Sequence, residues 1–572
     1  MSDKQQQVSG SLVIAEALVQ LGIKHVFGIV GIPVIEVANA LIARGIKFIS
    51  FRNEQAAAYA ASIYGYLTGL PGVCLVVGGP GVLHAIAGVG NASANHLPFL
   101  LLAGSSETHQ VEKGAFQELD QVAYLAPHTK LSVRPASIEA IPTLLEKAYR
   151  TAYFGRPGPT YVDLPADFIQ GSVAAATSAV RKIAPPGPAP RAAADPARIA
   201  QAVALLREAE SPLLIIGKGA AYAQAEGAIR SFQETVQLPF LPTPMGKGVL
   251  PDDSPLNTSA ARSAALKSAD VILLLGARLN WILHYGEAPK FRPDVKIIQV
   301  DVAAEELGNN AGSAPLGIVG DINLVVAQLH DALVQLGSGT LGNGSGKLPA
   351  AIEAVKERNT QKARVVENNN VVPLKYQPVY RVIREVLARQ PRKVVYVSEG
   401  ANTMDISRSA FPLNEPRTRL DAGTNATMGV GLGYAIAAKA VDPTSLVVAI
   451  EGDSAFGFSL AEVDTAVRHH LPIIFFVINN SGVYHGVDPA RYENQEQNPL
   501  PATALALDTK YHLLGESFGA LGYEVRDLQQ LEAAVTDAVK KDQVAVINVI
   551  IESGKDKKLE FGWMASTKKA KL

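Results

Sequence analysis

The chain has 572 residues, too many for a single hydrophobic core, and ordinary domain sizes predict about three units. Apolar residues make up 48% and charged residues 18%, and 52 Lys and Arg residues against 53 Asp and Glu residues give a formal charge of −1. This balance excludes the broad positive field with which proteins attract nucleic acids or anionic lipids, so we expect small molecules and copies of the chain itself as partners. The single cysteine, Cys74, excludes a disulfide framework and a thiolate metal cluster within the chain.

The two ends of the sequence bear on location. The first residues, "MSDKQQQVSG", lack a charged start followed by an apolar stretch, and no apolar run is long enough to cross a bilayer, so we expect a soluble protein with no membrane partner. The last three residues, Ala570, Lys571 and Leu572, resemble a C-terminal peroxisomal address. In a eukaryote they predict a peroxisomal location and an import receptor as a partner. In a bacterium they would be a solvated basic tail on a cytoplasmic protein.

Two stretches lack apolar periodicity and are rich in residues that end helices and strands: "APPGPAPRAAAD" from Ala184 and "GSGTLGNGSGK" from Gly337. They predict domains over residues 1–183, 196–336 and 370–552, followed by a tail over residues 553–572. Within each domain short apolar runs alternate with helical stretches, as in "SPLLIIGKG", "AEGAIRSFQETV", "ADVILLLGARL" and "VKIIQVD" of the middle domain. This alternation predicts an α/β fold with three doubly wound parallel sheets covered by helices.

The first domain contains a strand and an Ala-rich helix in "KFISFRNEQAAAYAASIYGYLTG", with Glu54 at their junction. Next comes "VCLVVGGPGVLHAIAGVGNASANHLPFLLLAG", which predicts a strand, a glycine turn, a helix, His-Leu-Pro and a second strand. The third domain repeats this order in "LVVAIEGDSAFGFSLAEVDTAVRHHLPIIFFVIN". The spacing from the end of the first strand to the histidine differs by one residue between Val77–His96 and Ile450–His470. The first and third domains are therefore predicted to be copies of one fold, with chance similarity of two βαβ units as the alternative.

Polar residues follow two neighbouring strands of the third domain. Asp453 comes just after "LVVAI", and Asn479 and Asn480 come just after "IIFFVI". Parallel strands of a βαβ unit end at the same edge of the sheet, so Asp453 and Asn480 are expected to face one another there. Together with the backbone carbonyl of Gly482 they form a set of hard oxygen ligands suited to Mg²⁺ or Ca²⁺. The small residues Ser454 and Ala455 would let backbone N–H groups approach a phosphate at the start of the next helix.

The segment from "GDS" to "NN", separated by residues 455–478, resembles the Gly-Asp-x, Asn-Asn signature of enzymes that depend on thiamine diphosphate, with Ser454 where many members have glycine. The resemblance implies a pyrimidine-binding first domain, a middle domain and a third domain that binds the diphosphate and Mg²⁺. It implies that Glu54 is the glutamate that bonds to a ring nitrogen of the cofactor and activates it. Without the resemblance, Glu54 would be interpreted as complementing its helix dipole. In such enzymes Glu54 of one subunit meets Asp453 of another, so we expect at least a homodimer, with a homotetramer as the fuller assembly.

The resemblance narrows to 2-hydroxyacyl-CoA lyases, with oxalyl-CoA decarboxylases as close relatives, and it covers nearly the whole chain. The stretches that carry it are "GAFQELDQ" from Gly114, "SEGANTMDISR" from Ser398, "TMGVGLGYAIAAK" from Thr427 and "GDSAFGFS" from Gly452. It implies that Met428 lies under the cofactor and bends it into a V, ordinary core packing being the other interpretation. It also implies that Tyr376, Ala401 and Asn402 line the diphosphate or the thiazolium ring.

The lyases split a 2-hydroxyacyl-CoA into formyl-CoA and an aldehyde one carbon shorter, and the decarboxylases release CO₂ from oxalyl-CoA. Phe116 and Gln117 stand where the decarboxylases carry Tyr-Glu, and an apolar ring beside a neutral amide suits an alkyl group better than a carboxylate. We therefore expect the lyase, active in fatty acid α-oxidation, with Gln117 as a catalytic residue and Phe116 as a substrate contact. The alternatives are the decarboxylase, an acetohydroxyacid synthase, which would carry flavin, and an inert regulatory paralogue, against which the intact Glu54, Asp453 and Asn480 argue.

The middle domain has no full GxGxxG motif with an acid at the expected distance, which argues against a nicotinamide-dependent dehydrogenase. Its resemblance to oxalyl-CoA decarboxylases implies a site for ADP as an activator, in which arginine and lysine would bind phosphates and Asp301 the ribose. The residues concerned are Arg156, Lys218, Arg278, Asp301 and Asp321.

Lys247 and Arg408 are the expected anchors for the phosphates of a CoA substrate, and the tail "GKDKKLEFGWMASTKKAKL" is an expected lid over the CoA chain. For each of two histidines the sequence allows two interpretations. His84 either faces the cofactor or packs at a helix start, and His485, just after the metal loop, either moves a proton or has no role.

Overall fold

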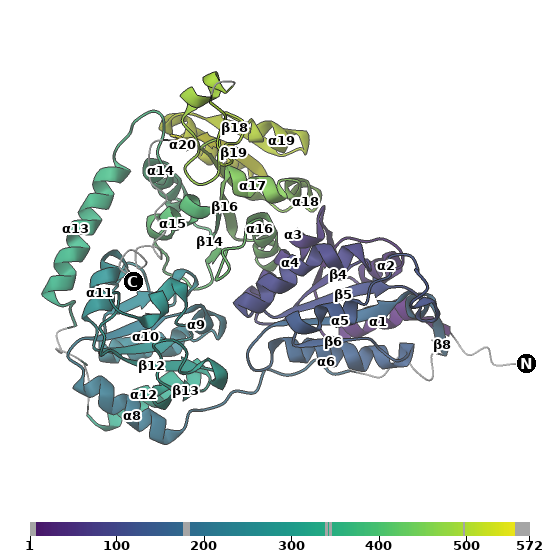
Figure 1. Ribbon diagram of the computed structural model, residues 1–572, viewed down its shortest axis with the longest axis horizontal. Coiled ribbons are helices and arrows are strands. Elements are labelled where there is room, and N and C mark those ends of the chain that lie inside the picture. Colours follow the sequence, from purple (N-terminus) through teal and green to yellow (C-terminus); the bar gives the residue numbers. More distant parts are fainter. Residues whose placement is uncertain (1–6, 175–182, 338–340, 342–345, 496–497, 555–572) are drawn as a thin grey trace, which may run out of the picture.

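The computed structural model describes residues 7–174, 183–337, 341, 346–495 and 498–554 (Figure 1). Three separate parallel sheets, each covered by helices, account for most of this part of the chain. The α/β class and the three parallel sheets predicted from the sequence are confirmed. None of the helices in the described ranges is both long and apolar enough to span a membrane.

The N-terminal domain is built on a six-stranded sheet in the order β3-β2-β4-β5-β7-β6, in which all pairs are parallel. Its strands are β2 (His25–Gly28), β3 (Lys47–Ser50), β4 (Gly72–Val76), β5 (Phe99–Ser105), β6 (Leu131–Val133) and β7 (Pro159–Pro165). Its helices are α1 (Gly10–Gln20), α2 (Ile35–Ala43), α3 (Glu54–Thr68), α4 (Pro80–Asn95), α5 (Gln121–Leu125), α6 (Ile141–Tyr153) and α7 (Ala166–Gln170). A small antiparallel pair, β1 (Gln7–Ser9) with β8 (Ser172–Ala174), joins the two ends of the domain.

The middle domain has a five-stranded parallel sheet in the order β10-β9-β11-β12-β13. Its strands are β9 (Pro212–Ile216), β10 (Phe240–Pro242), β11 (Val271–Leu275), β12 (Lys296–Asp301) and β13 (Ile318–Val319). Its helices are α8 (Pro196–Glu208), α9 (Lys218–Tyr222), α10 (Glu226–Val236), α11 (Arg262–Ser268) and α12 (Ile322–Gln335). The preceding linker predicted from Ala184 contains no helix or strand. The second linker lies mostly outside the described residues and is followed by α13 (Ala350–Glu367), a helix for which the predicted domains left no place and which runs from the middle towards the C-terminal domain (Figure 1).

The C-terminal domain has a second six-stranded parallel sheet, in the order β15-β14-β16-β17-β19-β18. Its strands are β14 (Val394–Glu399), β15 (Arg419–Asp421), β16 (Leu446–Gly452), β17 (Ile473–Asn479), β18 (Leu521–Val525) and β19 (Ala545–Ile550). Its helices are α14 (Tyr376–Ala388), α15 (Ala401–Ala410), α16 (Gly431–Val441), α17 (Asp453–Ser459), α18 (Glu462–Arg468), α19 (Tyr511–Ser517) and α20 (Leu528–Lys541).

The N- and C-terminal sheets share one topology. In each, the second strand along the chain lies at the edge, followed by the first, third, fourth, sixth and fifth. His96 and His470 both end the segment before the fourth strand in a left-handed conformation, each with φ of 51°. The predicted repeat is therefore confirmed, down to the histidine before Leu-Pro.

One hydrophobic core joins the two repeated domains through α3, α4 and α16. The Ala-rich sequence of α3 lets other helices approach its backbone closely. A Cβ atom added to Gly88 of α4 would lie 2.3 Å from the Cβ of Ala58, and one added to Gly433 of α16 would lie 2.6 Å from the carbonyl oxygen of Ala56. Small residues at these crossings therefore set how closely the N- and C-terminal domains pack.

Candidate active site

The carboxyl ends of β14, β16 and β17 meet at one edge of the C-terminal sheet. Glu399 pairs in register with Glu451, and Gly452 pairs with Ile478. A Cβ on Gly400, whose φ is 94°, would come within 3.3 Å of the backbone nitrogen of Gly452. Glycine on neighbouring strand ends thus leaves the backbone open at the edge where parallel sheets bind ligands.

Asp453 begins α17 directly after β16 and is 2% exposed. Its carboxylate accepts hydrogen bonds from the backbone N–H of Ser454 at 2.8 Å and of Gly482 at 3.0 Å. Burial raises the pKa of Asp453 to about 7, against which these backbone donors act. No Lys, Arg or His forms an ion pair with Asp453 among the described residues, so its negative charge lacks a positive partner from this part of the chain.

The two asparagines after β17 have different roles. Asn479 is a structural residue, because its amide donates to the Thr509 carbonyl and to Asn548, both at 3.1 Å. The amide of Asn480 donates to the carbonyl of Tyr484 at 3.1 Å, and Asn402 donates to the same carbonyl at 3.1 Å. The predicted residues Asn402 and Asn480 are therefore brought together, with their side-chain oxygens remaining as acceptors.

Asn402 also fixes the tautomer of His485. Its amide nitrogen lies 2.8 Å from Nδ1 of His485, and an amide nitrogen can only donate. Nδ1 is then the acceptor, and the ring proton sits on Nε2. In this arrangement the Nε2–H group of His485 is a donor in the loop after β17.

Tyr376 and Met428 approach the same edge. Burial raises the pKa of the Tyr376 hydroxyl, and the negative charge of Asp453 contributes to this shift, so the two groups are near one another. Met428 is half-buried, in the loop before α16, which argues against its interpretation as an ordinary core residue. That loop is held by Glu399, whose carboxylate accepts hydrogen bonds from the N–H groups of Gly429 and Gly431.

These residues fit a divalent cation with a bound diphosphate. One buried carboxylate without a positive partner, an amide oxygen and a backbone carbonyl are hard oxygen donors that leave positions for phosphate oxygens. No group of three or more His, Cys, Asp or Glu side chains in the described residues could hold a metal, so a ligand set built on Asp453 depends on amide and backbone oxygens. An added Cβ on Gly457 would meet nothing within 4 Å, so α17 also leaves space for a ligand beside Gly457.

Glu54 begins α3 in the N-terminal domain, after an Asn53 cap that accepts the N–H of Gln55. Oε2 of Glu54 lies 3.0 Å from Nδ1 of His84 on α4. The backbone just before it is bonded to α18, because the N–H of Arg52 lies 3.2 Å from both carboxylate oxygens of the buried Glu462. Among the described residues no hydrogen bond or ion pair joins Glu54 to the strand-end residues of the same chain.

Phe116 and Gln117 lie in a loop against the glycine turn before α4. Phe116 is 73% exposed, and Gln117 has a φ of 55°, a left-handed conformation unusual for its residue type. A Cβ on Gly79 would come within 2.6 Å of the carbonyl oxygen of Gln117, so this turn accepts the loop only because residue 79 is glycine. Buried Gln121 fixes the arrangement by accepting the N–H of Gly79 at 2.9 Å.

All five residues predicted for ADP line one cavity of about 660 Å³, which also receives residues from the N- and C-terminal domains. Arg156 comes from the N-terminal domain and is bonded to Glu306 at 2.6 Å, whereas Arg278 comes from the middle domain and is bonded to the carbonyl of Ala94 at 2.7 Å. Burial, followed by the charges of Arg278 and Arg156, lowers the pKa of Lys218 to about 7. Lys218, Arg156 and Arg278 therefore lie close enough to affect one another's charge, and such a group of basic side chains suits an anion. Asp321 has a further role, since it caps α12 through the N–H of Leu324.

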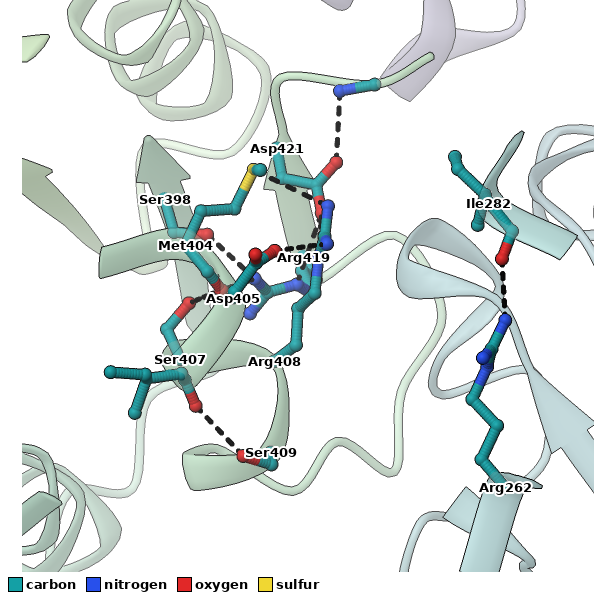
Figure 2. A network of polar contacts seen from close by, with 12 residues as sticks. Arg262, Ile282, Ser398, Met404, Asp405, Ser407, Arg408, Ser409, Arg419 and Asp421 are labelled. Atoms are coloured by element: carbon teal, nitrogen blue, oxygen red, sulfur yellow. Dashed lines mark hydrogen bonds and ion pairs between the residues drawn. The ribbon is translucent and has the colours of Figure 1, made fainter. Parts of the chain in front are cut away.

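The two residues predicted to anchor CoA are not brought together as a pair. Arg408 lines the same cavity and lies between Asp405 at 2.6 Å and Asp421 at 3.2 Å, beside the buried Arg419 (Figure 2). Lys247 is 8% exposed and forms an ion pair with Asp252 at 2.5 Å. Its ammonium group is thus held by a neighbouring acid, and it does not line that cavity.

Comparison with known proteins agrees with this geometry. Three family models match, described as the N-terminal TPP binding domain, the central domain and the C-terminal TPP binding domain of thiamine pyrophosphate enzymes, over residues 8–124, 199–329 and 399–549. The chain belongs to the thiamine pyrophosphate enzymes. This confirms the family predicted from the sequence.

Curated relatives match over nearly their full length. The chain is 45% identical to 2-hydroxyacyl-CoA lyase 1 of Homo sapiens, over 98% of this chain and 97% of the relative. It is 45% identical to 2-hydroxyacyl-CoA lyase of Saccharomyces cerevisiae, over 96% and 97%. It is 38% identical to oxalyl-CoA decarboxylase of Escherichia coli K12, over 96% of each.

Three residues near the candidate site of this thiamine pyrophosphate enzyme were not predicted as site residues from its sequence. Glu399 and Glu451 are fully buried side by side at the strand ends, and burial raises the pKa of both carboxyl groups. The sequence feature that could have indicated them is a glutamate directly before a glycine at the end of a strand, in "SEG" and "IEG". Ser553 was missed as well, and its hydroxyl donates to the carbonyls of Asn480 at 2.6 Å and Val487 at 2.8 Å. The predicted lid lies outside the described residues from residue 555 on, as do Ala570, Lys571 and Leu572.

Proposed function

We propose that this chain is a thiamine-diphosphate-dependent 2-hydroxyacyl-CoA lyase, which splits a 2-hydroxyacyl-CoA into formyl-CoA and an aldehyde one carbon shorter. The observation that carries the proposal is 45% identity over 98% of the chain to a 2-hydroxyacyl-CoA lyase, in a protein whose Asp453 and Gly482 are joined at the sheet edge. When bound, the cofactor would supply the electron sink that lets the carbon–carbon bond next to the carbonyl break.

Asp453, Asn480 and the carbonyl of Gly482 would hold Mg²⁺, and through it the diphosphate. Ser454 and Ala455 at the start of α17 would offer backbone N–H groups to the phosphates. Three further residues, Tyr376, Ala401 and Asn402, would line the diphosphate and thiazolium, and Met428 would set the bend of the cofactor. Support comes from the placement of these residues around the ends of β14, β16 and β17.

Glu54 would bond to a ring nitrogen of the cofactor and exchange a proton with it. Oε2 of Glu54 is bonded to His84 of its own domain, and in the enzymes that the chain resembles this glutamate meets the aspartate of another subunit, so we infer that Glu54 serves a site whose Asp453 belongs to a second copy of the chain. The active unit would then be a homodimer or a homotetramer built from such dimers. Pairing each Glu54 with the other chain's Asp453 gives two sites in each dimer.

Phe116 and Gln117 would face the substrate. The largely exposed ring of Phe116 offers apolar contact to an alkyl chain, and the amide of Gln117 offers a neutral hydrogen-bonding group. Both Lys247 and Arg408 are paired with acids, but only Arg408 lines the cavity, so it is the better-placed candidate for a CoA phosphate.

The cavity lined by Arg156, Lys218 and Arg278 would bind an activating nucleotide such as ADP, with Asp301 on the ribose. Support comes from its size, its basic side chains and its walls from all three domains. In a eukaryote the C-terminal tripeptide would direct the enzyme to peroxisomes through an import receptor, and in a bacterium the enzyme would be cytoplasmic. The peroxisomal setting would suit fatty acid α-oxidation.

The second candidate is an oxalyl-CoA decarboxylase, which the 38% identity to the Escherichia coli enzyme favours. The two are separated by supplying the protein with thiamine diphosphate and Mg²⁺, then with a 2-hydroxyacyl-CoA or with oxalyl-CoA, and measuring aldehyde, formyl-CoA and CO₂. Aldehyde and formyl-CoA from the first substrate are the expected result. CO₂ from oxalyl-CoA with no aldehyde from the other substrate would instead assign the decarboxylase, and no product from either would remove both.

A further inference from the structure

In the part of the chain that the structure describes, one side chain bonds to the proposed catalytic carboxyl group of Glu54. Nδ1 of His84 lies 3.0 Å from Oε2 of Glu54, and among the described residues no other hydrogen bond or ion pair reaches that carboxyl group. In the single chain the two side chains differ in their access to solvent, because the His84 side chain is 62% exposed and that of Glu54 is 13% exposed. An exposed titratable ring is therefore the link between solvent and a sheltered carboxyl group.

Helix packing fixes this pair. Helices α3 and α4 both lead back from the carboxyl edge of the sheet, so they run in the same direction. They touch where Gly88 meets Ala58, since an added Cβ on Gly88 would lie 2.3 Å from the Cβ and 3.0 Å from the carbonyl carbon of Ala58. One turn earlier on each helix stand His84 and Glu54, so the close crossing brings these two side chains opposite one another.

We propose that His84 carries protons between solvent and the carboxyl group of Glu54. The proposal rests on the proposed function, in which Glu54 exchanges a proton with the cofactor ring. Once Glu54 has given up that proton it is a carboxylate with little exposed surface, and it must be protonated again before it can repeat the step. His84 is positioned to do this and touches solvent on its other side.

The transfer balances without any further reactant. His84, protonated on both ring nitrogens, gives the proton on Nδ1 to Oε2 of Glu54; an N–H bond breaks, an O–H bond forms, and both side chains become neutral. The imidazole then takes up a proton from water or buffer acid through its exposed side. The reverse sequence removes a proton from Glu54.

Two substitutions separate proton transfer from mere positioning. His84→Asn keeps an N–H donor that can bond to Glu54 but cannot carry a proton, and His84→Ala removes both functions. Because His84 is largely exposed, both variants should fold, which thermal melting and size-exclusion chromatography would check. His109→Ala is the matched control, because His109 is 66% exposed and its Nε2 lies 3.1 Å from Oε2 of Glu107 in the same domain.

The measurement uses the full-length protein with bound thiamine diphosphate and Mg²⁺ and no substrate. The protein is mixed with D₂O and quenched with acid, and the loss of the proton on the reactive thiazolium carbon is followed by NMR. We expect both His84 variants to slow this exchange roughly 100-fold, the size typical of a positioned acid or base. Added imidazole should restore part of the rate in His84→Ala, cofactor affinity measured by tryptophan fluorescence should stay near that of the wild type, and His109→Ala should exchange at the wild-type rate.

Wild-type exchange in both His84 variants would overturn the proposal. Exchange at the wild-type rate in His84→Asn, with slow exchange in His84→Ala, would also overturn proton transfer. A side chain that bonds to Glu54 without carrying a proton would then be sufficient. Failure of the proposed function would look different: the wild-type protein would fail to bind the cofactor or would release no aldehyde from a 2-hydroxyacyl-CoA.

Discussion

The crossing of α3 and α4 makes a prediction whose sign depends on the structure. Gly88 and Gly90 both lie inside α4, where alanine is preferred to glycine by about 0.5–1 kcal/mol. At Gly90 an added Cβ meets nothing within 4 Å. Gly90→Ala should therefore stabilise the protein by about 0.5–1 kcal/mol and raise the melting temperature by about 1–4 °C.

At Gly88 the same change should destabilise. The new Cβ would lie 2.3 Å from the Cβ of Ala58, an atom that cannot rotate away because it is fixed to the helix backbone. Overpacking of this kind costs about 1–3 kcal/mol. We place Gly88→Ala in the upper part of that range for this reason, and after the gain in helix preference the net loss is about 1–2 kcal/mol, or about 2–8 °C in melting temperature.

The assay is thermal melting of the two variants and the wild type, side by side, at equal concentration without ligands. Shifts of opposite sign support the close helix crossing. A rise in melting temperature for Gly88→Ala equal to that for Gly90→Ala would refute it, and would also remove the reason given for the His84–Glu54 pair.

Glu54→Gln should lower turnover roughly 100-fold or more while the cofactor still binds, because the amide keeps a hydrogen bond but cannot exchange the proton; turnover assays with a fluorescence titration of the cofactor test this. The variants Glu54→Gln and Asp453→Asn should each be inactive alone, but a mixture of the two should recover about a quarter of wild-type activity. Half of the randomly assorted dimers contain one copy of each variant, and in these dimers one of the two sites is intact. If activity does not recover after subunit exchange, both residues belong to the site of one chain. The pKa of Asp453 is raised to about 7, so its contribution to stability is present at low pH and is lost as pH rises through about 7. Mg²⁺ with thiamine diphosphate binds the ionised form, so the rise in melting temperature that they cause should be larger at about pH 8 than at about pH 6, and Asp453→Asn should abolish that difference. Arg278→Ala should weaken ADP binding about 10- to 100-fold by calorimetry, the loss expected for one charge-assisted hydrogen bond, whereas Arg292→Ala, which removes an exposed pair with Asp294, should not change it.

The sequence alone determined the fold class, the repeat and the strand-end cluster. Each is a local property: apolar runs that are buried on both faces of a parallel sheet, such as "IIFFVI", stand out from the chain, and so do the polar residues that follow them. Parallel strands joined by a helix must end at one edge, so Asp453 and Asn480 could be placed together before the structure was known.

Only the tertiary structure decided which charged residues reach the cavity between the domains. Lys247 and Arg408 are equally basic in the sequence and both are paired with acids in the structure, but only Arg408 lines the cavity between the domains. The partner of Glu54 was also beyond the sequence, because His84 meets it only where Gly88 and Ala58 allow two helices to touch. Contacts between residues far apart in the chain depend on how closely helices and strands pack against one another. The sequence pattern shows which segments prefer helix or strand, but it does not show the distance between two such segments.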